Sequence, residues 1–287
     1  MNIATTAEQL RHMLAPTRSE RIALVPTMGC LHEGHLSLIR KAKRLADIVV
    51  VSIYVNPLQF GAHEDLDCYP RPWQDDVALC EKESVDFIFH PHNLYPSDGS
   101  KVTLSVTELD HVLCGASRTG HFDGVATVVN ILFNTVQPHL AIFGEKDWQQ
   151  LAIIHRMVAD LHMPVEIIGS AIIREFDGLA LSSRNRYLSE QQRQQATHIS
   201  AALLLMQELA AQNTSLELIH QQAMDYLHQH NIQPEYLDIR DENNLESIQH
   251  LGQYLGQHQA RIFIAAKLGE TRLIDNMPLI LNLEKTA

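Results

Sequence analysis

Long hydrophobic runs are missing from this sequence. No stretch of its 287 residues approaches the roughly 20 consecutive apolar residues that a helix needs to cross a bilayer. The first residues, MNIATTAEQLRHML, lack the order of a secretory signal peptide, in which a charged stretch precedes an apolar one and a cleavage site. We therefore expect neither membrane association nor secretion.

Cysteine is also scarce. The four cysteines, Cys30, Cys68, Cys80 and Cys114, show no C-x-x-C spacing. The pattern indicates neither a zinc site nor a disulfide framework, and it favours the reducing cytoplasm.

Basic residues are outnumbered. The chain has 22 Lys and Arg against 34 Asp and Glu, which gives a formal charge of −12 and a pI near 5.7. A nucleic-acid partner is not expected, because a phosphate backbone needs a basic surface. Anionic substrates would have to be attracted by local cations.

One stretch organises the rest of the chain, from Arg21 to Ala46. It predicts a buried strand over Ile22–Val25 that Pro26 ends, then a glycine-bearing loop and an amphipathic helix over Glu33–Leu45. The loop brings His32 and His35 to the first helical turn, where both imidazoles project to the same side.

Two imidazoles beside the N–H groups and positive dipole end of a helix suit a triphosphate. A zinc helix normally has histidines at i and i+4 with a positioned Glu, and His32 and His35 are three residues apart. The alternative for an isolated H-x-x-H is that both are merely polar residues at a helix start. Gly29 and Gly34 favour a ligand, because glycine permits close approach of the backbone.

The string P-T-M-G-C-L-H-E-G-H, residues 26–35, resembles the HIGH-type signature of the nucleotidylyltransferase superfamily. Its specific form resembles the pantothenate synthetase (pantoate–β-alanine ligase) family. The resemblance extends over essentially the whole chain and is least diagnostic in the C-terminal quarter.

Strand and helix patterns alternate through the first part of the chain. Apolar runs predict strands within Asp47–Val55, Val85–Pro91, Leu140–Lys146 and Pro164–Arg174, with helices between them. This order predicts an α/β fold with a Rossmann-like, doubly wound parallel sheet. We expect this domain to span residues 1–176 and to bind ATP and pantoate.

Three segments between these strands carry further expectations. The segment Lys101–Val106 alternates polar and apolar residues, which predicts a half-exposed edge strand. Asp75 and Asp76 are interpreted as first-turn residues that cap the helix and complement its dipole, and the resemblance leaves open a role near the metal or pyrophosphate. The string G-H-F-D-G-V places His121 ahead of another helix and resembles the family's stretch that closes over pantoate.

Gln59 follows a predicted strand, in the string N-P-L-Q-F. Loops at the carboxyl ends of parallel strands line the ligand crevice of open α/β sheets, so its amide can donate to and accept from a substrate. A surface glutamine in a loop more often has no function. The resemblance implies that Gln59 contacts pantoate.

The string G-E-K-D-W-Q-Q, residues 144–150, also follows a predicted strand. Lys146 is a point charge suited to phosphate oxygens. Asp147 can cap the next helix, or hold a ribose hydroxyl or a magnesium-bound water. Gln150 lies one turn after Lys146, and the resemblance implies that it binds pantoate.

The segment Asp177–Arg186 contains D-G-L-A-L-S-S-R-N. Ser182, Ser183 and Arg184 supply two hydroxyls and a guanidinium, the groups of a mobile phosphate clamp. For S-S-R alone a solvated loop is the simpler interpretation. In this wording, after a fifth strand, it resembles the KMSKS-type loop of the superfamily.

A smaller α+β domain is expected over residues 177–287. Its pattern predicts two helices, the first capped by Ser189, and then strands over Pro234–Asp241, Ala260–Gly269 and Thr271–Leu279. Gly269 and Glu270 predict a hairpin. We hypothesise that this domain closes over ATP as a lid.

The resemblance implies a two-step ligase. Pantoate's carboxylate would attack the α-phosphorus of Mg²⁺-bound ATP to give pantoyl adenylate, and the amine of β-alanine would then release AMP and pantothenate. His35, His32, Lys146 and Arg184 would be catalytic, and Gln59 and Gln150 would hold pantoate. The residues expected to bind ATP are Met28, Gly29, Cys30, Leu31, His32, Glu33, Gly34, His35, Gly144, Glu145, Lys146, Asp147, Ile173, Leu181, Ser182, Ser183 and Arg184.

The same resemblance implies a cytoplasmic homodimer that uses small-molecule substrates. Two rivals are a nucleotidylyltransferase that transfers the nucleotide permanently to an acceptor and a nucleotide sensor that binds without turnover. A tRNA synthetase also adenylates a carboxylate, but this sequence shows no basic surface signal or anticodon-binding extension.

Overall fold

The computed structural model of the chain describes residues 1–62, 64–212, 214–248 and 260–279. The chain divides into two compact units. The first unit comprises residues 1–111, 115–145 and 153–173, and the second comprises residues 112–114, 146–152 and 174–287. Helices α4 (Leu113–Ser117) and α6 (Trp148–Asp160) contribute residues to both units.

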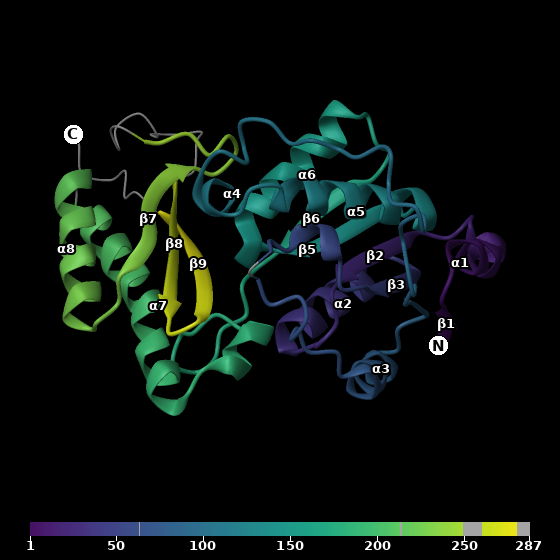
Figure 1. Cartoon of the computed structure of the whole chain (residues 1–287), viewed down its shortest axis with the longest axis horizontal. Coiled ribbons are helices and arrows are strands. Elements are labelled where there is room, and N and C mark those ends of the chain that lie inside the picture. The colour runs from purple at the N-terminus through teal and green to yellow at the C-terminus, as the bar shows by residue number, and fades with distance from the viewer. Residues whose placement is uncertain (63, 213, 249–259, 280–287) are drawn as a thin grey trace. The chain divides into compact units, whose positions relative to one another are not determined.

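The first unit is built on a six-stranded sheet in the order β1-β4-β3-β2-β5-β6, and every pair in it is parallel. Figure 1 shows β2, β3, β5 and β6 among the helices of this unit. The predicted Rossmann-like sheet is thus confirmed, and the three-residue β1 is an addition that the sequence pattern did not indicate. The strands are β1 (Asn2–Ala4), β2 (Ile22–Thr27), β3 (Ile48–Ile53), β4 (Phe87–Phe89), β5 (Leu140–Gly144) and β6 (Glu166–Ser170).

Helices cover both faces of this sheet. Helices α2 (Glu33–Leu45) and α3 (Trp73–Lys82) pack on one face through a cluster that includes Ile39, Val51 and Ile142, all fully or almost fully buried. The connections through α2 and α3 run toward one edge of the sheet, and those through α1 (Ala7–Leu14) and α5 (His121–Val136) run toward the other. Because such crossovers are right-handed, α1 and α5 cover the other face, where they pack on each other. The predicted bounds of α2 agree with the structure, because its apolar stripe and its capping residue coincide.

The strand order reverses at β2, which has β3 on one side and β5 on the other. In open α/β sheets, ligands bind outside the carboxyl ends of the strands at such a switch point. His32 and Gln59 lie in the segments that follow β2 and β3, and Gly144 is the last residue of β5. Sheet topology therefore gathers these three predicted segments at one edge of the first unit.

Pro26 lies inside β2, so the prediction that it ends the strand is wrong. The carbonyl of Thr27 accepts the N–H of Tyr54, on the side of the neighbouring strand β3. The backbone polar groups of successive residues in a strand point toward opposite neighbouring strands, so the backbone nitrogen of Pro26 faces β5. Pairing with β5 extends only to Leu24. A missing N–H disrupts no ladder there.

The segment Lys101–Val106 forms no strand, so the predicted edge strand is also wrong. The N–H of Leu104 donates to Thr127 Oγ1 at 3.1 Å, and the N–H of Val106 donates to Asp123 Oδ1 at 2.7 Å. Both acceptors lie on α5, which begins at His121 and so includes the residues expected ahead of it. Side chains of α5 thus accept the backbone N–H groups of this segment, as the carbonyls of a neighbouring strand would.

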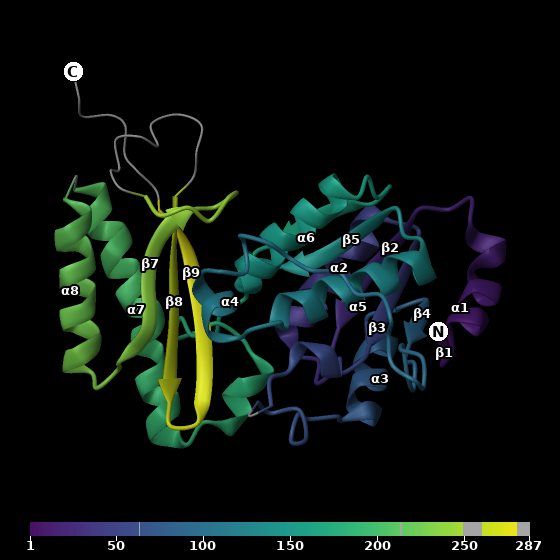
Figure 2. The same cartoon turned by 45° about the horizontal axis from the view of Figure 1, so that its top comes forward.

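The second unit contains an antiparallel sheet in the order β7-β8-β9, with helices α7 and α8 packed on one face (Figure 2). Ser189 caps α7 as predicted, and the hairpin at Gly269 joins β8 to β9 with a positive φ of 60°. The elements are α7 (Glu190–Ala211), α8 (Leu216–Gln229), β7 (Pro234–Asp241), β8 (Ala260–Leu268) and β9 (Thr271–Leu279).

Short 3₁₀ turns complete the elements of the described residues: η1 (Ala15–Thr17), η2 (Pro57–Gln59), η3 (Glu145–Asp147) and η4 (Ser183–Tyr187). Within the same residues, no helix is both long enough and apolar enough to traverse a bilayer.

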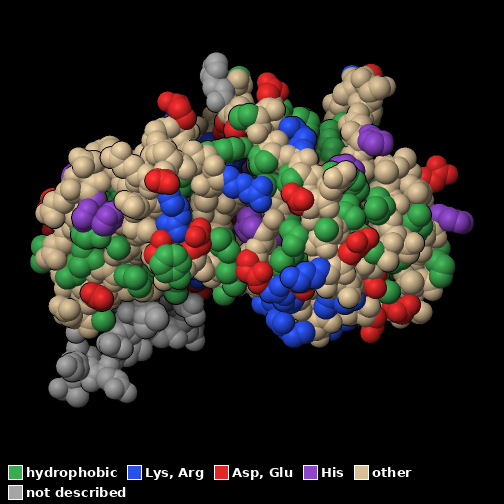
Figure 3. All heavy atoms as spheres, turned by 90° about the horizontal axis from the view of Figure 1, so that it is seen from below, with side chains coloured by type: hydrophobic (Ala, Val, Ile, Leu, Met, Phe, Trp, Pro, Cys, Tyr) green, Lys and Arg blue, Asp and Glu red, His purple; other side chains and the backbone are tan. Residues whose placement is uncertain are grey.

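The face in Figure 3 shows scattered Asp and Glu and one gathering of Lys and Arg. The net charge of −12 is therefore not a uniform negative surface.

Candidate active site

His32 and His35 cap the first turn of α2 with their own rings. His32 Nδ1 accepts the N–H of Gly34 at 3.1 Å, and His35 Nδ1 accepts the N–H of His32 at 3.3 Å. The ring centroids lie 4.1 Å apart, so the prediction that both rings share one side is confirmed.

The Nδ1 contacts define what the two histidines offer a ligand. An Nδ1 that accepts a hydrogen bond carries no proton, so in each neutral ring the proton is on Nε2. The expectation that the helix N–H groups themselves meet an anion is wrong for Gly34 and His32, because their N–H groups bond the rings. Each neutral ring instead carries an N–H donor at Nε2.

Asp76 fixes the loop that precedes these histidines. The carboxylate lies on α3, is 1% exposed, and accepts the N–H of Cys30 at 2.9 Å and of Leu31 at 2.7 Å. Asp76 does lie in the first turn of α3, but the N-cap of α3 is Pro72 and makes no side-chain cap bond, so the capping interpretation is wrong. The Asp76 oxygens instead bond a loop 45 residues away in sequence.

The same loop adopts an uncommon backbone. Gly29 has φ 81° and Cys30 has φ 51°, a conformation that costs energy for a residue with a side chain. A Cβ at Gly29 would lie 2.9 Å from Asp76 Oδ2 and 3.0 Å from Ile53 Cγ2. Glycine at position 29 and the two bonds to Asp76 together hold this loop in place.

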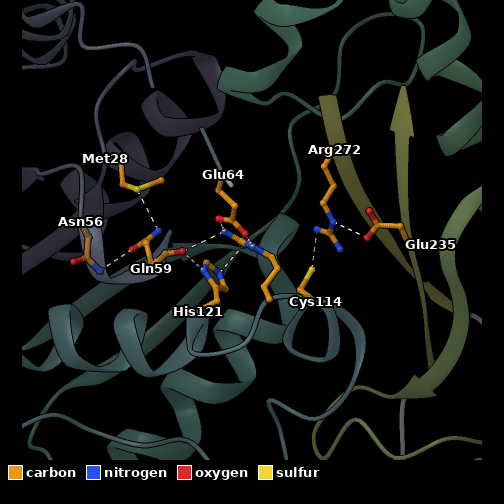
Figure 4. A network of polar contacts seen from close by, with 9 residues as sticks. Met28, Asn56, Gln59, Glu64, Cys114, His121, Glu235 and Arg272 are labelled. Atoms are coloured by element: carbon orange, nitrogen blue, oxygen red, sulfur yellow. Dashed lines mark hydrogen bonds and ion pairs between the residues drawn. The ribbon is translucent and has the colours of Figure 1, made fainter. Parts of the chain in front are cut away.

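Asn56 sets the orientation of the Gln59 amide (Figure 4). Its Oδ1 accepts the N–H of Leu58 at 3.3 Å and its Nδ2 donates to the carbonyl of Gly124 at 3.1 Å, so backbone groups fix which atom is which. Asn56 Nδ2 also donates to Gln59 Oε1 at 3.1 Å. Tyr95, whose pKa burial raises, donates its hydroxyl to Asn56 Oδ1 at 2.6 Å.

Gln59 therefore presents its Nε2 as a donor, with Met28 Sδ at 3.2 Å, while its Oε1 already accepts a bond. We expected both amide atoms to be available to a substrate. Oε1 has two lone pairs and keeps one acceptor position beside its bond to Asn56, and Nε2 can donate to an acceptor such as a hydroxyl or carboxylate oxygen.

The predicted residues Lys146 to Gln150 lie in η3 and the first turn of α6, in the second unit. Asn276 Nδ2 donates to the carbonyl of Lys146 at 2.9 Å. The Arg261 guanidinium lies 3.3 Å from the ring centroid of Trp148, whose Nε1 donates to the carbonyl of Glu242 at 2.7 Å. These contacts hold the backbone of this turn, and Lys146 and Gln150 are half-buried on it.

The Ser182–Arg184 segment follows a tight turn that is tied down on two sides. Arg174 pairs with Asp275 through two bonds of 2.6 and 2.9 Å and also donates to the carbonyl of Gly178. Arg193, on α7, bonds Glu175 at 2.8 Å and Asp177 at 2.9 Å.

Within the segment, Ser182 Oγ accepts the N–H of Arg184 at 3.3 Å and caps η4. The residues that precede the expected mobile clamp are therefore held by ion pairs to β9 and α7.

Comparison with known proteins shows the family. A family model described as pantoate-beta-alanine ligase matches residues 2–278. A pantothenate synthetase of Sulfurihydrogenibium sp. is 45% identical over 96% of this chain and 99% of its own, and one of Acinetobacter baumannii is 46% identical over 96% and 98%. This chain belongs to the pantoate-beta-alanine ligase family.

Solved structures of this family agree. Pantothenate synthetase from Thermus thermophilus superposes with a TM-score of 0.91 at 42% identity, over 96% of this chain and 99% of that one. Pantoate-beta-alanine ligase from Francisella tularensis, complexed with beta-gamma ATP and beta-alanine, gives 0.81 at 33%, over 96% and 97%.

For this member of the pantoate-beta-alanine ligase family, sequence reasoning missed the residues that hold the predicted ones. Asn56 and Arg118 both bond Gln59, and Asp76, which the sequence indicated only as a helix-capping residue, bonds the loop before His32. Asn56 stands in the string N-P-L-Q-F and Arg118 lies three positions before His121, but a single sequence does not show which distant backbone group a side chain reaches.

Proposed function

We propose that this chain joins pantoate to β-alanine in an ATP-dependent reaction that yields pantothenate, AMP and pyrophosphate, as membership of the pantoate-beta-alanine ligase family indicates. Pantoate's carboxylate attacks the α-phosphorus of ATP and pyrophosphate leaves. The amine of β-alanine then attacks the carbonyl carbon of the pantoyl adenylate, and AMP leaves. The complex of the Francisella tularensis relative supports ATP and β-alanine as ligands.

The observation that carries the proposal is the His32 and His35 pair. In both rings Nδ1 accepts a backbone N–H, so the proton of the neutral ring is on Nε2. The pair lies between the carboxyl end of β2 and the first turn of α2. Negative charge builds up on the phosphate oxygens during in-line displacement, and fixed donors there lower the barrier. His35 is the proposed proton donor and His32 its partner on the phosphates.

Lys146 and Arg184 are proposed to neutralise the α-phosphate and the leaving pyrophosphate, while Ser182 and Ser183 bind the triphosphate. Met28 and Ile173 are proposed to line the adenine and ribose pocket, and Gly29, Cys30 and Leu31 to contact ATP. Gln59 and Gln150 are proposed to hold pantoate, with Gln59 donating from Nε2 to a pantoate oxygen. The lid role of residues 177–287 remains a prediction.

Magnesium is proposed to arrive with ATP. The described residues contain no group of three or more His, Cys, Asp or Glu that could hold a metal ion. Mg²⁺ bound to nucleotides needs no such group, because phosphate oxygens and water fill most of its coordination sphere. Bound there, the ion would neutralise phosphate charge.

A cytoplasmic homodimer is the proposed state of the protein. The family resemblance and the cysteine pattern support this proposal. Sedimentation equilibrium of the purified chain tests it, and a single species of about 32 kDa would contradict the dimer.

Isotope exchange between pyrophosphate and ATP, with pantoate present and β-alanine absent, tests the proposed reaction. Pantoate-dependent exchange would establish adenylate formation. Transfer of the nucleotide to a phosphorylated acceptor, without such exchange, would instead indicate a nucleotidylyltransferase. Binding of ATP without either reaction would indicate a sensor.

A further inference from the structure

Beside Gln59 lies a polar cluster that the proposed reaction does not yet use. It comprises Glu64, Arg118 and His121, all in the first unit, and it meets Gln59 at the backbone carbonyl (Figure 4). The inference drawn from it rests on the proposed role of Gln59 in pantoate binding.

Arg118 determines the protonation of His121. Its Nη1 lies 2.9 Å from His121 Nε2, and a guanidinium can only donate, so Nε2 accepts and carries no proton. The proton of the neutral ring is therefore on Nδ1. His121 Nδ1 lies 2.7 Å from the carbonyl oxygen of Gln59 and donates to it.

Glu64 holds Arg118 in place. It accepts two bonds from the guanidinium, at 2.7 and 2.6 Å, in a paired geometry that fixes the plane of the fork. Burial alone would raise the pKa of Glu64, but the bonds and charge of Arg118 outweigh it and lower that pKa. Arg118 Nη2, which bonds Glu64, also donates to the Gln59 carbonyl, at 3.3 Å.

Backbone packing makes this arrangement stiff. A Cβ at Gly124 would lie 2.3 Å from the carbonyl oxygen of Leu58 and 2.8 Å from the nitrogen of Gln59. The first turn of α5 therefore presses directly on η2. A shift of His121 cannot be absorbed by slack between these two elements.

We propose that His121 is a positioning residue for pantoate: Arg118 keeps it in the Nδ1–H tautomer, and it sets the place of Gln59 through the Gln59 carbonyl. His121 acts through Gln59 and does not contact pantoate itself. Asn56 orients the Gln59 amide from one side, and His121 and Arg118 hold its backbone from the other.

The first test compares two amide replacements of His121. In His121→Asn the side-chain N–H can occupy the place of Nδ1–H, whereas in His121→Gln it reaches the place of Nε2. We expect the KM for pantoate to stay within about twofold in His121→Asn. In His121→Gln and His121→Ala it should rise about three- to tenfold, the worth of one neutral hydrogen bond, with the KM for ATP unchanged.

The second test combines His121→Ala with Gln59→Ala. If His121 acts through Gln59, the double variant has nearly the pantoate KM of Gln59→Ala alone. Multiplied effects would mean that His121 binds pantoate independently, which overturns the proposal. Equal pantoate KM values in His121→Asn and His121→Ala would overturn it as well.

His139→Ala is the matched control. His139 Nδ1 also bonds a backbone group, the N–H of Ile22 at 3.0 Å, at the amino end of β2. Its loss should leave the pantoate KM unchanged. A rise equal to that in His121→Ala would mean that general destabilisation, not positioning, explains the effect.

A substrate-independent measurement separates this inference from the proposed function. Nitrogen-15 NMR of labelled histidine should show His121 protonated at Nδ1, and Arg118→Ala should change that signal. A proton on Nε2 in the wild-type chain overturns the inference. Absence of pantoate-dependent exchange in a wild-type chain with the expected tautomer overturns the proposed function.

Discussion

The carboxylate of Asp76 accepts the backbone N–H of Cys30 at 2.9 Å. A second bond joins it to Leu31, at 2.7 Å, so one buried side chain fixes two consecutive peptide groups of the loop before His32. Cys30 has a positive φ, and such a backbone persists only where its surroundings hold it. The bond thus links the packing of α3 to the proposed phosphate site.

Removal of this carboxylate should therefore damage both stability and activity. We predict that Asp76→Ala lowers the free energy of unfolding by about 1–3 kcal/mol, the cost of leaving buried donors without a partner, and raises the KM for ATP. Urea denaturation and ATP-dependent kinetics measure the two effects. Asp75→Ala, at the exposed neighbouring position, is the control for stability and should unfold as the wild type does.

His35 should be sensitive to which ring nitrogen is replaced. We predict that His35→Asn slows pantoate-dependent exchange by about 100- to 1000-fold, the usual cost of losing a donor to transition-state charge. His35→Gln should retain more activity, because its amide N–H can reach the place of Nε2–H. Equal rates in the two variants would contradict the assignment of Nε2 as the acting atom.

The ion pair of Arg174 and Asp275 anchors the base of the Ser182–Arg184 segment. Asp275 has a side chain 3% exposed, so Asp275→Ala leaves a partly buried arginine without its partner. We predict a loss of about 3 kcal/mol in unfolding free energy and a higher KM for ATP. The exposed pair of Arg156 and Asp160 is the control, and Asp160→Ala should cost less than about 1 kcal/mol.

The lowered pKa of Glu64 predicts a pH dependence of stability. A carboxyl whose folded pKa lies below its unfolded value stabilises the fold above the unfolded pKa, near 4.5, and loses that contribution as pH falls through the folded pKa. Glu64→Gln should therefore be less stable than the wild type at pH 7. Urea titrations between pH 7 and pH 3 should show the difference shrink below about pH 4.5.

Several elements could be predicted from local patterns because their causes are local. The apolar stripe of α2, the Ser189 cap and the hairpin at Gly269 each depend on residues within a few positions of one another. The predicted edge strand at Lys101–Val106 failed because Thr127 and Asp123, on a helix 23 and 17 positions away from the N–H groups concerned, accept their hydrogen bonds. Alternation records exposure of side chains and says nothing about where backbone donors find acceptors.

The sequence by itself determined the class of fold and the family through its motifs, and it singled out His32, His35 and Gln59 as the residues proposed for the chemistry. The tertiary structure decided which hydrogen-bond partners hold these residues and the loops around them. Gln59 meets His121 across 62 positions and Cys30 meets Asp76 across 46. The orientation of the Gln59 amide, and which nitrogen of His35 carries a proton, follow from hydrogen bonds whose partners only the folded chain brings within 3.5 Å.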